Sequence, residues 1–126
     1  MARTATLSGR IRVSEDAVPP IIDTAISATT PTVTQQIEIE SIQAASGGPT
    51  ALSLGGLSNI TMIYIAMFDN TTGAAKEGTL TVDAVALPAC TNFLFVGNDT
   101  GVGVTSVSLT SGAGNSTNIK MIAAGT

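Results

Sequence analysis

The pattern of apolar positions singles out residues 59–69, which read N-I-T-M-I-Y-I-A-M-F-D. In an extended conformation both sides of this stretch are apolar, because Ile63, Ile65 and Met67 alternate with positions that are also apolar. Its isoleucines, tyrosine and threonine favour a strand over a helix, and the D-N-T-T-G sequence at its end is typical of a turn. The pattern therefore predicts a central strand that is covered on both faces.

Alternating segments on either side predict further strands. Residues 3–13 alternate cleanly and predict a half-buried strand, in which Gly9 marks a bulge or a close crossing. Residues 32–42 repeat the pattern with glutamates on the polar side. Residues 21–30 fit either a short strand or an extended loop, closed by Pro31. Single strands are also predicted for residues 50–54, 79–87, 92–96, 102–110 and 117–123.

Three of these segments carry more specific predictions. Residues 92–96 form a compact apolar run and predict a buried strand. In residues 79–87, Leu80 and the alternate positions up to Ala86 are expected to face inward. In residues 102–110 the apolar positions change phase, which a bulge near Thr105 and Ser106 would reconcile.

About eight strands, separated by turns and without an amphipathic helix, predict an all-β fold. We expect one domain, residues 1–126, built as an antiparallel β-sandwich or barrel of jelly-roll type. An immunoglobulin-like sandwich is the alternative, although Trp is absent and there is only one Cys.

The composition points to association with other proteins. Only 11% of the residues are charged, the mean hydropathy is +0.40, and no apolar run reaches 18 residues. A Thr, Ser, Asn and Gly surface with few charges opposes contact weakly, which favours a homo-oligomer or larger assembly over a monomer.

The net charge of −4 argues against nucleic acid as a partner, and membrane insertion is not expected. The opening residues alternate and lack the apolar core of a secretory signal, so we expect them in the mature protein.

The sequence offers no catalytic constellation. There is no histidine, and Cys90, the only cysteine, is best explained as a small core residue. Asp69, Asp83 and Asp99 lie in three separate segments. We therefore predict that the chain is not an enzyme and that it has no catalytic residue, no cofactor, no disulfide and no structural zinc.

Two oxygen-rich turns are candidate calcium sites. Asp69 with Asn70, and Asn98 with Asp99, could ligate a hard cation, but the spacing of an EF-hand is absent. Ordinary turn formation explains these residues better, and no metal site is predicted. The glycines of residues 101–103 and 112–114 fit no phosphate-binding loop and are interpreted as turn and bulge residues.

Five charged residues are candidates for partner contacts. Arg3, Arg10 and Arg12 form the only basic cluster, and the last two share one strand face. They suit either a solvated face or an acidic surface of a neighbouring subunit. Glu38 and Glu40 offer a conceivable complement.

The whole chain resembles small β-rich structural proteins of tailed bacteriophages, especially capsid decoration (cement) proteins. The features that carry the resemblance are the opening M-A-R-T-A-T-L-S-G-R-I-R-V, the Ala-, Thr-, Ser- and Gly-rich strands, the segment at residues 57–68 and the closing residues 104–126. The resemblance implies a non-enzymatic protein on the capsid surface of a virion. Its partner would be the major capsid protein or another virion protein, and it would often form a trimer.

Two other classes of protein remain open. One is a tail, fibre or adhesin module that binds a glycan on the host surface, but such sites usually expose aromatic side chains. The four aromatics here all lie inside apolar runs: Tyr64, Phe68, Phe93 and Phe95. The other class is a pilin-like or surface-layer subunit that assembles by strand exchange.

Overall fold

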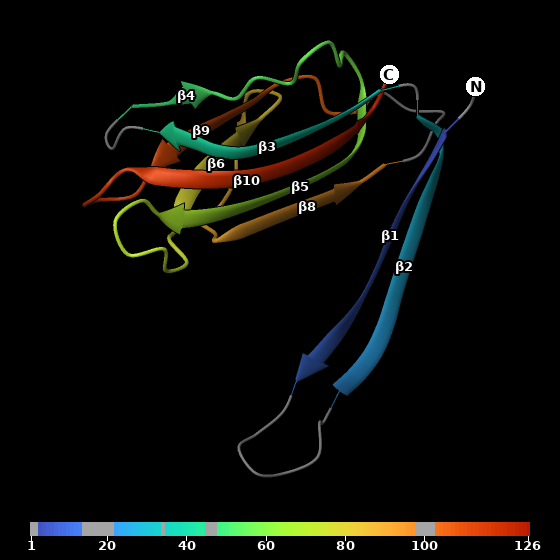
Figure 1. Cartoon of the computed structure of the whole chain (residues 1–126), viewed down its shortest axis with the longest axis horizontal. Coiled ribbons are helices and arrows are strands. Elements are labelled where there is room, and N and C mark those ends of the chain that lie inside the picture. The colour runs from blue at the N-terminus through green and yellow to red at the C-terminus, as the bar shows by residue number, and fades with distance from the viewer. Residues whose placement is uncertain (1–2, 14–21, 34, 45–47, 98–102) are drawn as a thin grey trace.

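The computed structural model describes residues 3–13, 22–33, 35–44, 48–97 and 103–126. These residues contain strands and no helix, and every strand pairing is antiparallel (Figure 1). The prediction of an all-β antiparallel fold is confirmed. The strands are β1 (Arg3–Val13), β2 (Ile22–Val33), β3 (Gln35–Ala44), β4 (Thr50–Ala51), β5 (Ile60–Asp69), β6 (Gly78–Val82), β7 (Val85–Ala86), β8 (Asn92–Val96), β9 (Val107–Ser111) and β10 (Thr117–Gly125).

The strands form three sheets. One four-stranded sheet has the order β3-β10-β5-β8, and the other has the order β4-β9-β6-β7. Within these two sheets the pairings are nested along the chain: β6 pairs with β7, β5 with β8, β4 with β9 and β3 with β10. β1 and β2 pair only with each other in the third sheet. We call residues 3–33 the arm and residues 35–126 the body.

The predicted central strand is confirmed as β5, which lies between β10 and β8. Its side chains Ile63, Ile65 and Met67 are fully buried. They share one hydrophobic cluster with residues of the other four-stranded sheet, such as Leu80 and Leu109. The core therefore joins the two sheets through their facing side chains.

The second face of β5 departs from the prediction. Tyr64 is 37% exposed, and Met62 and Phe68 are only partly buried. The other four-stranded sheet covers one face of β5, and the opposite face is left partly open. An apolar sequence on both sides of a strand thus does not guarantee cover on both.

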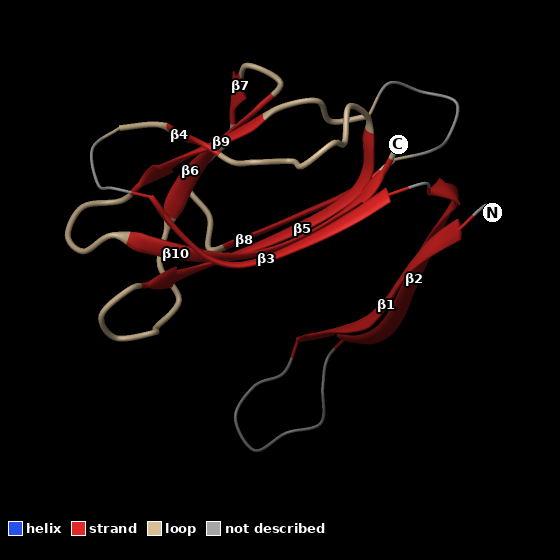
Figure 2. Cartoon of the chain, turned by 45° about the horizontal axis from the view of Figure 1, so that its top comes forward, coloured by secondary structure: helices blue, strands red, loops and turns tan. Residues whose placement is uncertain are grey.

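The arm runs apart from the body. β1 has the predicted bounds, but its apolar side is not packed as expected, since Ile11 is 52% exposed. Figures 1 and 2 both show the arm leaving the body near the C-terminus, on the side of β3-β10-β5-β8 away from the second sheet. The predicted feature at Gly9 is wrong: the register shift lies between Arg3 and Ala5, and Gly9 pairs regularly with Ile26.

The neighbouring strands also differ from their predicted bounds. Residues 22–33 form a strand, and Pro31 lies inside it rather than ending it. It sits opposite the register shift in β1, where a missing backbone N–H breaks no ladder hydrogen bond. β3 begins at Gln35, three residues later than predicted.

The predicted strand at residues 79–87 is divided by a tight turn. Asp83 and Ala84 both have positive φ, 47° and 67°, and they connect β6 to β7. Leu80 is buried as expected, but Ala84 and Ala86 are exposed. The turn lacks the Asn-Gly signature of a two-residue hairpin, which is why the sequence did not reveal it.

Ala84→Gly is expected to raise the free energy of unfolding by about 1 kcal/mol, because a left-handed conformation strains every residue that carries a Cβ. Urea denaturation of the variant measures this gain. Ala86→Gly is the matched control, and it should lower stability, since Ala86 is an exposed strand residue for which glycine adds only unfolded-state freedom. A loss of stability in Ala84→Gly would contradict the argument.

The phase change in residues 102–110 is a crossing between sheets and not a bulge. Val104 forms a bridge with Ile60 of β5, whereas β9 begins at Val107 in the other sheet. Both valines are buried in the shared core. β8 has the predicted bounds but is an edge strand, and its Leu94 is 42% exposed, so the prediction of a buried strand is wrong.

Candidate functional site

The outer face of the β3-β10-β5-β8 sheet carries a row of exposed apolar side chains. Ile122 pairs with Tyr64 across β10 and β5, and Tyr64 pairs with Leu94 across β5 and β8. Residues paired in this way share a face of the sheet. The three side chains are 44%, 37% and 42% exposed, respectively. We call Ile122, Tyr64 and Leu94 the apolar row.

The residues beside the apolar row are mostly apolar or neutral. Met62 pairs with Val96 and Ala124 on one side of the row, and all three are at most partly exposed. On the other side, the Tyr64 hydroxyl donates a hydrogen bond of 2.8 Å to Asn92 Oδ1. This bond satisfies the only polar atom of the tyrosine side chain, so the row presents hydrocarbon and ring surface to any partner.

The arm has one apolar and one polar face. Leu7, Gly9 and Ile11 alternate along β1, and the register places Ile26 and Thr24 of β2 beside Gly9 and Ile11. Leu7 and Ile26 are partly buried, while Ile11 is exposed. A two-stranded hairpin of this kind is marginally stable alone in water, which favours a partner on its apolar face.

The polar face of the arm carries the first of the predicted contact residues. Arg10 Nε donates to Asp23 Oδ1 across the hairpin, and both groups are solvent-accessible. Arg10 therefore has a partner within the arm, in addition to any contact with a neighbouring subunit. Arg3 and Arg12 lie on the same strand, at register positions opposite Val33 and Asp23.

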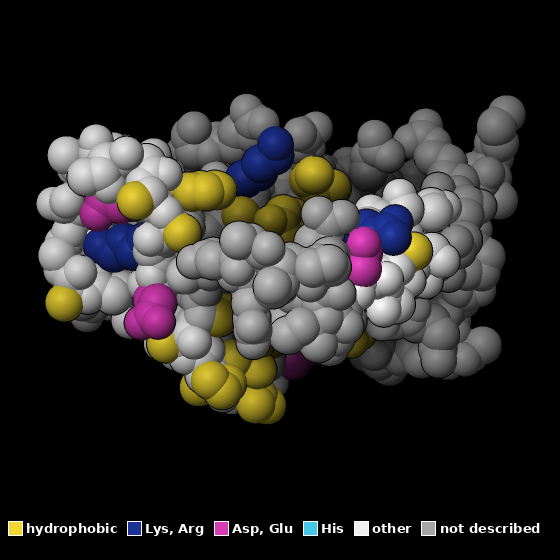
Figure 3. All heavy atoms as spheres, turned by 90° about the horizontal axis from the view of Figure 1, so that it is seen from below, with side chains coloured by type: hydrophobic (Ala, Val, Ile, Leu, Met, Phe, Trp, Pro, Cys, Tyr) yellow, Lys and Arg dark blue, Asp and Glu magenta, His cyan; other side chains and the backbone are white. Residues whose placement is uncertain are grey.

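The structure does not bring the predicted acidic residues to the arginines. Glu38 and Glu40 lie on β3, the edge strand of a four-stranded sheet, at register positions beside Ile122 and Lys120. Their role as a complement to the arginines stays a prediction. Figure 3 views the molecule from below, and most hydrophobic side chains visible on this face lie away from the neighbouring Arg and Asp side chains at one end.

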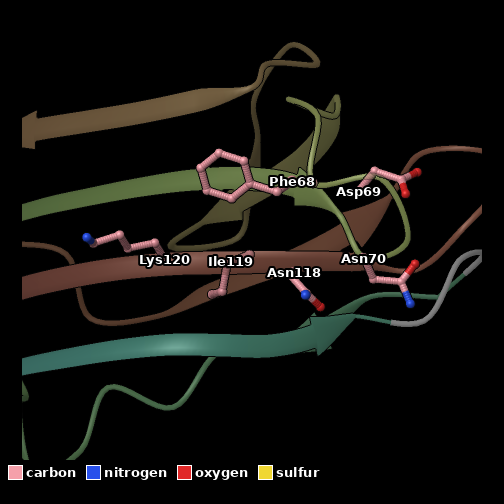
Figure 4. Close-up of a pocket in the computed structure, with 7 residues that line it drawn as sticks. Phe68, Asp69, Asn70, Asn118, Ile119 and Lys120 are labelled. Carbon is pink, nitrogen blue, oxygen red and sulfur yellow. The ribbon is translucent and has the colours of Figure 1, made fainter.

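A hollow of about 330 Å³ lies where β5 ends beside β10 (Figure 4). Asp69 borders it, but its carboxylate is engaged in the turn: Oδ1 accepts the N–H groups of Thr71 at 2.8 Å and Thr72 at 2.9 Å. Asn115 Nδ2 donates to both carboxylate oxygens. The arrangement supports the prediction that Asp69 forms a turn. The hollow is lined by Phe68, Asp69, Asn70, Gly73, Asn118, Ile119 and Lys120.

A second carboxylate, that of Asp83, connects the β6–β7 turn to residues 105–106, where the chain crosses from one sheet to the other. Asp83 Oδ1 accepts hydrogen bonds from the Thr105 hydroxyl at 2.7 Å and from the N–H groups of Thr105 and Ser106 at 2.9 Å each. The hydroxyl and backbone of Thr105 hold the pKa of Asp83 below its ordinary value of 3.8. The backbone N–H groups of Thr72 and Thr71 lower the pKa of Asp69 in the same way.

These two shifts predict a loss of stability in acid. A lowered folded-state pKa stabilises the fold above the ordinary value of 3.8, and the contribution is lost as the pH falls through the folded-state pKa. Urea midpoints measured from pH 6 to pH 2 should therefore fall most steeply below about pH 4. Asp69→Asn and Asp83→Asn should each flatten this fall, whereas Glu77→Gln, which removes an exposed carboxylate, should not. Equal slopes in all four proteins would contradict the argument.

Other candidate chemistry is limited. Cys90 is partly buried and packs against the edge of the hydrophobic core rather than inside it, and its backbone pairs with Gly78. The described residues contain no group of three or more Cys, His, Asp or Glu side chains placed to hold a metal ion. Asn98 and Asp99 lie outside the described residues. The described part of the chain has no helix long and apolar enough to cross a membrane.

No family model, curated protein or solved structure matches the chain. The candidate site therefore rests on its geometry alone. The sequence predictions missed the apolar row, because the side of β5 that carries Tyr64 was expected to be covered. The available signal was that Leu94 and Ile122 occur at positions that place apolar side chains on both faces of β8 and β10.

Proposed function

We propose that the chain is a non-enzymatic structural protein of a bacteriophage virion that binds the outer surface of the capsid and reinforces it. The observation that carries the proposal is the arm, which pairs with no strand of the body and whose Ile11 is 52% exposed. Such a hairpin is stabilised when the protein assembles with another surface. The capsid as that surface comes from the resemblance to decoration proteins.

We further propose that the body is a β-sandwich of jelly-roll type. The nested pairing of β3 with β10, β4 with β9, β5 with β8 and β6 with β7 supports this topology, because one long antiparallel hairpin rolled into two sheets gives these pairs. The hydrophobic cluster shared by both sheets supports the sandwich. Jelly rolls are common in viral capsid proteins, which agrees with the proposed location.

The apolar row also bears on the alternative of a glycan-binding module. Tyr64 is exposed, which the sequence did not lead us to expect. Its neighbours in the row are Ile122 and Leu94, and its hydroxyl is bonded to Asn92. Aliphatic neighbours suit a protein partner better than a sugar, which needs several polar groups around the ring.

Co-sedimentation tests the proposal. Capsids of a tailed phage that encodes this chain, produced without its gene, should bind the purified protein saturably with a Kd of about 1 µM or lower. Capsids that already carry the protein are the control and should take up no more. The decorated capsids should also break at a higher temperature. Absence of binding to the undecorated capsids would refute the proposal, and light scattering of the free protein would show whether it is the expected trimer.

A further inference from the structure

We propose that the arm of one copy docks by its apolar face on the apolar row of a second copy. This inference concerns the free protein, in which no capsid is present to cover the arm, and adds an interaction surface that the proposed function does not specify. Among the residues whose side-chain exposure the structure describes, five large hydrophobic side chains are exposed, and four of them lie on these two surfaces. They are Ile11 on the arm and Ile122, Tyr64 and Leu94 on the row, with Val85 as the fifth.

The two surfaces match in size. The apolar stretch of β1 from Leu7 to Ile11 covers four residue steps, about 13 Å. The row crosses from β10 over β5 to β8, which is two strand spacings, or about 10 Å. A strand laid across the sheet can therefore place Leu7 and Ile11 over the row, and both surfaces lose exposed hydrocarbon.

The distribution of charge favours contact between the arm and another body. Residues 35–126 contain two basic side chains, Lys76 and Lys120, against six carboxylates. The strands of the arm contain three arginines and one aspartate, a net charge of +2, and the segment that connects them adds Glu15 and Asp16, so the arm as a whole is neutral. Two bodies carry net charge of the same sign and repel each other, whereas the strands of the arm carry the opposite sign and are attracted to the body of the next copy.

The root of the arm favours a second copy over its own body. β2 ends at Val33 and β3 begins at Gln35, so the connection is very short. β2 also contacts β5 and β10, which fixes the direction in which the arm leaves. Short hinges disfavour folding back and favour exchange of the same element between copies.

Sedimentation velocity of single variants tests the docking. We expect the wild-type protein to associate, and Ile11→Asp or Leu94→Asp to raise the dissociation constant at least 100-fold. The controls are Ser8→Asp, on the polar face of the arm, and Val85→Asp, at an exposed position on the other sheet. Each should change the dissociation constant less than 3-fold. Circular dichroism checks folding, and Leu94→Ser replaces Leu94→Asp if that variant is unfolded.

Mixing the two variants gives the sharper result. Leu94→Asp retains an intact arm, and Ile11→Asp retains an intact row, so the mixture should form a complex of two chains that neither variant forms alone. Any one of four results would overturn the proposal. The wild-type protein could be monomeric, or its arm could dock on its own row. Only one of the two variants could weaken association, or the mixed variants could form no complex. A monomer that still binds capsids overturns this docking alone, and an arm-exchanged oligomer that ignores capsids overturns the proposed function alone.

Discussion

Gly103→Ala and Gly125→Ala are each expected to lower the free energy of unfolding by about 3 kcal/mol or more. A Cβ on Gly103 would lie 2.8 Å from the carbonyl carbon of Ile60, and a Cβ on Gly125 would lie 2.9 Å from the Cα of Ile60. Real Cβ atoms do not approach backbone so closely, and backbone cannot rotate away as a side chain can. Urea denaturation measures the loss, and expression without folded protein would be its extreme form.

The reason for the large effect is that three segments meet at the start of β5. Ile60 exchanges two backbone hydrogen bonds of 2.9 Å with Val104, at the crossing between the sheets. On its other side Asn59 is bonded to Thr126, just beyond β10. A shift of β5 to make room for a methyl group would weaken both connections at once.

Gly48→Ala is the matched control for this prediction, because a Cβ at Gly48 would meet nothing within 4 Å. It should change the free energy of unfolding by less than about 0.5 kcal/mol. If all three variants behaved alike, the close approach at Ile60 would not be a constraint on the fold.

The sequence predicted the strands better than the surroundings of each strand. The bounds of β1, β5 and β8 followed from alternation and turn residues, because these are local properties of the chain. Whether another layer covers a strand face is not a local property of the chain. β1 and β10 show similar alternation, yet Met121 is fully buried and Ile11 is exposed. Whether a second layer lies above an apolar face depends on topology, which periodicity does not encode.

The candidate site shows the same limit. The charge of Arg10 makes it a candidate, but its bond to Asp23 depends on the pairing of β1 with β2, and the sequence of residues 21–30 fits either a strand or a loop. The apolar row depends on the order β10-β5-β8. The turn at Asp83 is held by a carboxylate that reaches Thr105 more than 20 residues away, so no local turn signal was available.

Amide hydrogen exchange in the arm is expected to be at least 100-fold faster than in β5, when the protein is dilute enough to be monomeric. β1 and β2 pair only with each other, and Ile11 gains little from burial. β5 pairs on both sides and its core-facing side chains are fully buried, so its amides open only when the body unfolds. Mass spectrometry of peptides from residues 3–13 and 60–69 compares the two directly.

The matched reference within the body is β8, an edge strand that also has one unpaired side. It should exchange more slowly than the arm, because Phe93 and Phe95 pack against the hydrophobic core. Exchange in β1 as slow as in β8 would mean that the arm is stabilised without a partner, and that its apolar face needs none. If a second copy covers the arm, we expect protection of the arm from exchange to rise with protein concentration, while protection of β8 stays unchanged.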